Sequence, residues 1–85
     1  MNLIEQRCKS SFDSTVKQIE FYRKGMINAA KDDKFFEVIT CKKEVERYED
    51  KLGLLAYLLS GNVVGSKYYK KYMKVMNYNR WDLRD

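Results

Sequence analysis

The 85-residue sequence contains no histidine, no proline, two cysteines and four glycines. Without histidine, neither a Ser-His-Asp triad nor a Cys-His pair can form, and no metal can be bound through imidazole. Cys8 and Cys41 lie 33 positions apart, which is not the paired spacing of a zinc site. We therefore expect a protein that is not an enzyme, with no catalytic residues, metal, cofactor or small-molecule substrate.

A long apolar run is also missing. The longest apolar stretch, residues 52–59, is interrupted by Gly53 and falls far short of the ~20 residues that span a membrane. Near the start of the chain, Glu5, Gln6 and Arg7 interrupt any apolar segment of the kind found in a signal peptide. We expect a cytoplasmic protein with reduced cysteines and no membrane span.

The composition that remains is 45% hydrophobic and 34% charged, with a net charge of +5, which is typical of one small globular domain. Because proline is absent and apolar residues recur at intervals of three and four, the sequence predicts an all-α protein. We expect a long antiparallel helical hairpin followed by a shorter C-terminal helix, as in a three-helix bundle. The predicted helices cover residues 3–30, 33–60 and 67–79, with a turn at 61–66 and a tail at 80–85.

The first predicted helix has two interpretations. Its apolar residues recur at helical spacing from Ile4 to Ala29, which predicts one long helix. Alternatively, Ser10 followed by Asp13 resembles a helix start, with a short helix before it. The polar break at residues 31–34 then predicts a tight turn, with Asp32 or Asp33 capping the next helix.

The second predicted helix has the most regular pattern in the chain. Its apolar residues follow alternating steps of three and four, as in a coiled coil or helical bundle; this seam comprises Val38, Cys41, Val45, Tyr48, Leu52, Leu55 and Leu59. Residues 54–59 are apolar on every side of the helix, so we expect the third helix or a second chain to cover them. Gly61 and Ser66 are suited to end the second helix and to begin the third.

The last 25 residues carry most of the excess positive charge. Four lysines lie on one face of the predicted third helix, and we call them the lysine ridge: Lys67, Lys70, Lys71 and Lys74. With Tyr68, Tyr78, Arg80 and Trp81 they form a candidate partner-binding site, because phosphates attract lysines and aromatic rings stack on bases. In the alternative interpretation, Tyr69, Tyr72, Met73 and Met76 pack onto residues 54–59 while the lysines only face water.

Three functional hypotheses follow. We prefer a small regulator, inhibitor or assembly factor that binds a protein partner. The sequence combines the seam, the apolar end of the second predicted helix and an aromatic C-terminus, but it contains no catalytic motif. Small chains rich in Lys, Tyr and Asn and free of Pro and His also suggest a phage or other mobile element, and hence a host cytoplasm. The second hypothesis is a nucleic-acid-binding protein that uses the lysine ridge. The third is a structural homodimer through the seam residues Val38, Val45, Tyr48, Leu52, Leu55 and Leu59.

Overall fold

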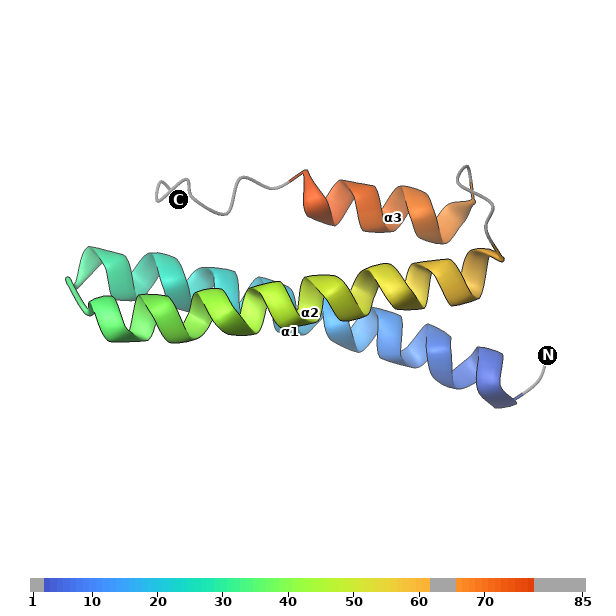
Figure 1. Cartoon of the computed structure of the whole chain (residues 1–85), viewed down its shortest axis with the longest axis horizontal. Coiled ribbons are helices and arrows are strands. Elements are labelled where there is room, and N and C mark those ends of the chain that lie inside the picture. Colours follow the sequence, from blue (N-terminus) through green and yellow to red (C-terminus); the bar gives the residue numbers. More distant parts are fainter. Residues whose placement is uncertain (1–2, 62–65, 78–85) are drawn as a thin grey trace.

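The computed structural model describes residues 3–61 and 66–77, and this part of the chain contains three helices and no strand: α1 (Leu3–Lys31), α2 (Phe35–Ser60) and α3 (Lys67–Met76). The helices α1 and α2 form an antiparallel hairpin, and α3 runs back along α2 (Figure 1). The predicted fold class is confirmed. The first helix is continuous from Leu3, so the alternative start at Ser10 is not used.

The core of the hairpin is built from residues seven positions apart. On α1 these are Phe12, Ile19 and Met26, and on α2 they are Val45 and Leu52; each is at most 1% exposed. A seven-residue interval returns almost to the same side of a helix, so each series forms one stripe. The α2 stripe packs on α1, where the Tyr22 and Tyr48 rings stack with centroids 5.9 Å apart. The predicted seam therefore holds the hairpin together within one chain.

The turn between α1 and α2 differs from the prediction. Asp33 has a left-handed conformation (φ 58°), and its N–H donates to the Ala30 carbonyl at 3.2 Å. The Lys34 N–H donates to the Ala29 carbonyl at 2.8 Å, which completes a Schellman motif. Lys34 precedes α2 without a side-chain cap. The prediction that Asp32 or Asp33 caps α2 is therefore wrong, because these residues end α1 instead.

The predicted caps at the other turn are confirmed. Gly61 ends α2 in a left-handed conformation (φ 55°), and its N–H donates to the Tyr57 carbonyl at 3.0 Å. Ser66 caps α3 by accepting a hydrogen bond from the Tyr69 N–H at 3.4 Å. The helix ends at Met76, three residues before the predicted end at Asn79; residues 78 and 79 lie outside the described part of the chain.

The packing face of α3 is also different from the expected one. The residues that pack on the core are Tyr68, Tyr72 and Val75, whereas Met73 is 52% exposed. Tyr72, which the expected and the observed faces share, lies against Gly53 of α2, where a Cβ atom would lie 3.2 Å from its hydroxyl oxygen. The missing side chain lets the Tyr72 ring lie directly against α2, and Tyr68 and Val75, four residues before it and three after it, pack on the same side of α3.

Candidate functional site

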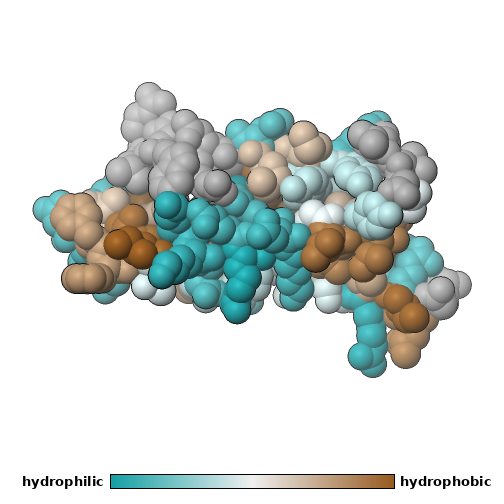
Figure 2. All heavy atoms as spheres, in the orientation of Figure 1, coloured by the Kyte–Doolittle hydropathy of each residue, from teal (hydrophilic) through white to brown (hydrophobic). Residues whose placement is uncertain are grey.

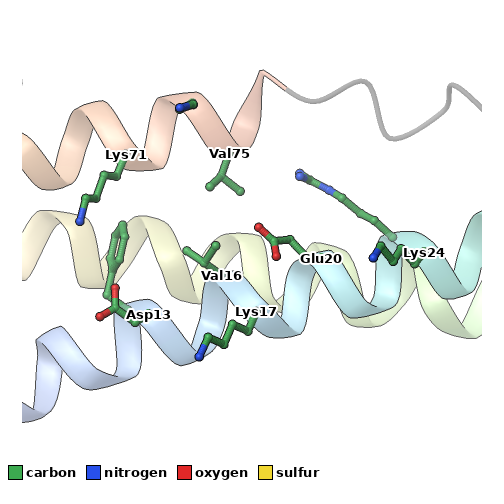
Figure 3. A pocket seen from close by; sticks show the side chains of 10 residues that line it. Asp13, Val16, Lys17, Glu20, Lys24, Lys71 and Val75 are labelled. Carbon is green, nitrogen blue, oxygen red and sulfur yellow. The ribbon is translucent and has the colours of Figure 1, made fainter. Parts of the chain in front are cut away.

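A groove of about 850 Å³ lies between α1 and α3 (Figure 3). It exists because α3 packs mainly against α2, which leaves one flank of α1 uncovered. We refer to this feature as the α1–α3 groove and regard it as the candidate functional site.

The floor of the groove is apolar. Phe12, Val16 and Val75 line it, and in Figure 3 Val16 and Val75 point toward each other from α1 and α3. Phe12 is held in place by the edge of the Tyr68 ring, whose centroid lies 5.3 Å from its own at an angle of 73°. Phe12 belongs to the buried core cluster, and Val16 and Val75 pack against it, so the floor of the groove is continuous with the core.

The two rims of the groove differ in charge. The α1 rim alternates in sign and has no net charge; it comprises Asp13, Lys17, Glu20 and Lys24, all exposed. The α3 rim is formed by Lys71 and Lys74, which are both exposed. In Figure 3 the Glu20 carboxylate reaches toward α3 and Lys17 points away from it. The site is therefore apolar at its base and positively charged on the α3 side.

A buried ion pair between α1 and α2 borders the groove. The Arg23 guanidinium donates to the Glu49 carboxylate at 2.8 Å, and the two side chains are 7% and 5% exposed. Arg23 also lines the groove, so this pair ties α1 to α2 next to it. Sequence reasoning missed the pair, although its signal was present: each residue stands among the buried positions of its own helix, Arg23 between Ile19 and Met26, and Glu49 between Val45 and Leu52.

Only two of the four lysines of the lysine ridge line the groove. All four lysines are exposed, but only Lys71 and Lys74 line the groove, whereas Lys67 and Lys70 do not. Tyr68 is half-buried against Phe12, and the Lys71 ammonium lies 5.7 Å from the centroid of its ring. The other predicted partner-binding residues, Tyr78, Arg80 and Trp81, lie outside the described residues.

The predicted oligomer seam lies inside the chain. Val45, Leu52 and Leu55 are buried, and Val38, Tyr48 and Leu59 are half-buried. Because Leu52 and Leu55 share a core cluster with Phe12 and Ile19 of α1, these side chains are occupied by the hairpin itself. Their use between two copies would require α1 to move away from α2.

Two patches of exposed apolar side chains lie at the ends of the hairpin. At the open end, α1 contributes Leu3 and Ile4 and α2 contributes Leu54 and Leu58; each is at least 61% exposed. Figure 2 shows this apolar surface over the last turns of α2 and at the start of α1. Ile4 and Leu58 also line a hollow of about 270 Å³. At the turn end, Phe35, Phe36 and Ile39 are exposed.

We call Leu3, Ile4, Leu54 and Leu58 the open-end patch. The expectation that the apolar end of α2 is covered is met on one side only. Ala56 is buried in the core cluster, against which Tyr68 and Tyr72 of α3 pack. Leu54 and Leu58, in contrast, are exposed. Contiguous apolar surface of this kind is common at protein interfaces.

Neither cysteine forms a disulfide, and both are half-buried. Burial raises the pKa of the Cys41 thiol, and the nearby carboxylates of Glu37 and Glu44 raise it further. Within residues 3–61 and 66–77, no group of three or more metal-ligating side chains comes together. In the same residues no helix combines the length and the apolar character needed to cross a membrane.

Comparisons with protein-family models, with curated proteins and with solved structures found no match to this chain.

Proposed function

We propose that this chain is a small, non-catalytic helical protein that acts by binding a partner protein, as a regulator, inhibitor or assembly factor. The observation that carries the proposal is the α1–α3 groove, in which the half-buried side chains of Val16 and Val75 lie between two helices. Grooves of this form are a common means by which proteins bind the helices of their partners.

The exposed apolar side chains at the ends of the hairpin support the same proposal. Leu54 and Leu58 are 67% and 65% exposed on one face of α2. Exposing aliphatic side chains to water costs about 25 cal/mol per Å² relative to burying them, so a partner that covers them gains free energy. The lack of histidine throughout the chain supports the non-catalytic part of the proposal.

Site-specific photo-crosslinking in cells that naturally express the protein tests this function. We would place benzoylphenylalanine at position 20, on the α1 rim, and at position 43 as a matched control, because Lys43 is an exposed α2 residue that does not line the groove. We expect a discrete crosslink to a second protein from position 20 only. Equal capture from both positions, or crosslinks only to nucleic acid, would contradict the proposal.

A second candidate function is nucleic-acid binding, which one observation favours. The ten residues of α3 include four lysines and no acidic residue, and all four lysines are exposed. If each lysine neutralises one phosphate, the logarithm of the binding constant falls with that of the salt concentration at a slope of about −3 to −4. Fluorescence anisotropy of a short DNA duplex measures this slope, and the absence of salt-dependent binding removes this candidate.

A further inference from the structure

We propose that the α1–α3 groove binds an amphipathic helix of the partner protein, about three turns long, whose acidic side chains face α3. This inference rests on the proposed function and specifies the chemistry of the partner. Three features of the groove lead to it: its length, its apolar floor and the unequal charge of its rims.

The length of the groove matches a short helix. On α1 the lining extends from Phe12 to Lys24, which corresponds to about 18 Å at 1.5 Å per residue. A helix of about 12 residues, or slightly more than three turns, covers this distance. The lining helices α1 and α3 run in the same direction (Figure 1). Because α3 contributes only Lys71, Lys74 and Val75 to the lining, the docked helix would lie along α1 and meet α3 over about one turn.

The floor requires an apolar stripe on the docked helix. Val16 and Val75, which are half-buried, present the apolar surface above the buried Phe12 ring, and Figure 3 shows the two valines on opposite sides of the groove. Aliphatic side chains at intervals of three and four on the partner would reach this floor from one face. The remaining faces of the docked helix would meet the rims and the solvent.

The rims determine where the charges of the partner lie. The four charged residues of the α1 rim have no net formal charge. In Figure 3, however, Glu20 reaches toward α3 and Lys17 points away from it, so this rim offers the docked helix no excess of positive charge. The α3 rim carries Lys71 and Lys74 without an acidic neighbour in the helix. Acidic side chains are therefore favoured on the side of the docked helix that faces α3, and this asymmetry also selects its orientation.

The lysine ridge offers a matched control for this inference. Lys71→Glu with Lys74→Glu reverses two charges on the groove, and Lys67→Glu with Lys70→Glu reverses two charges on the same helix outside it. The two double variants have the same net charge. All four residues are exposed, so neither variant removes a side chain from the core.

The probe is a 14-residue amphipathic peptide with leucines on one face and glutamates on the other, compared with a version that carries lysine in place of glutamate. Binding to the full chain is measured by calorimetry at about 0.15 M salt, where charges more than ~8 Å apart are largely screened. We expect only the acidic peptide to bind. Its affinity should fall at least tenfold in the Lys71/Lys74 variant and no more than threefold in the Lys67/Lys70 variant.

Amide chemical shifts show where the acidic peptide binds. We expect changes at residues 12–24 and 71–75, around the groove. Changes confined to the open-end patch, equal binding of the basic peptide, equal losses in the two double variants, or no binding of either peptide at millimolar concentration would each overturn the inference. If photo-crosslinking from position 20 still captures a protein in that case, the proposed function stands and the acidic-helix inference alone fails.

Discussion

Replacing Glu49 with leucine tests the buried Arg23–Glu49 ion pair beside the groove. The substitution leaves the Arg23 guanidinium buried without the carboxylate that it contacts at 2.8 Å. Removing one partner of a buried ion pair typically costs about 3–5 kcal/mol. Because Arg23 also lines the groove, its side chain can turn toward water, so we expect the lower end of that range, about 3 kcal/mol.

The size of this effect is large for such a small chain. At 0.05–0.15 kcal/mol per residue, an 85-residue domain has a total stability of roughly 4–13 kcal/mol. A loss of about 3 kcal/mol lowers the Tm by roughly 12 °C or more. Circular dichroism of thermal and urea unfolding measures the change.

The exposed pair between Arg47 and Glu44 provides the matched control. Its atoms lie 2.7 Å apart, but the side chains are 67% and 28% exposed. Surface ion pairs contribute little to stability, so Glu44→Leu should leave the Tm close to that of the unmodified chain.

A double substitution keeps the test informative if Glu49→Leu alone fails to fold. Replacing both Arg23→Met and Glu49→Leu removes both charges and fills the space with apolar groups, which restores stability in comparable cases. We expect the double variant to be more stable than Glu49→Leu. The reasoning is refuted if Glu49→Leu costs no more than Glu44→Leu, or if the double variant gains nothing over Glu49→Leu.

Three further predictions concern the turn, the docking of α3 and Cys41. Asp33→Gly should stabilise the chain by about 1 kcal/mol, because glycine adopts the left-handed conformation at φ 58° without steric cost. An unchanged or lower Tm of this variant would contradict the prediction. Gly53→Ala should lower the free energy of unfolding, because the added methyl group displaces the Tyr72 ring. In a Tyr72→Ala background the same substitution should raise the free energy of unfolding by about 1 kcal/mol, because alanine favours the helix more than glycine does. If urea unfolding shows a change of the same sign in both backgrounds, Tyr72 does not pack closely on Gly53. In a Cys8→Ser variant at pH 7.5, iodoacetamide should alkylate Cys41 more slowly in the folded chain than in the urea-unfolded chain. The reason is that the raised pKa of the Cys41 thiol reduces its thiolate fraction. Equal alkylation rates in the two states would contradict the raised pKa.

The hairpin could be predicted from the sequence because its signals are local. The spacing of Val45, Leu52 and Leu55 determines one face of α2, and the residues that end α2 and begin α3, Gly61 and Ser66, act through their own backbone neighbours. The structure places each of these residues as expected. Periodicity and capping depend on sequence separations of less than two helical turns.

The groove could not be predicted because it depends on contacts between distant segments. Tyr72 packs at Gly53, 19 positions earlier, and in this packing Lys71 and Lys74 line the groove together with α1. The helical pattern of α3 alone favoured a face with Met73 and Met76, since it carries no information about where α2 lacks a side chain. Asp33 shows the same limit on a smaller scale, because an aspartate between two helices is suited both to end one and to begin the next.

Crosslinking from both rims of the groove tests the central claim most directly. Benzoylphenylalanine at position 20 on the α1 rim and, in a separate variant, at position 74 on the α3 rim would be followed by mass spectrometry of the captured peptides. If the groove holds one helix of a partner protein, both positions capture the same protein, within a single segment of about 12 residues that contains acidic side chains. Capture of different proteins, of distant segments, or of no protein from either rim would contradict the account.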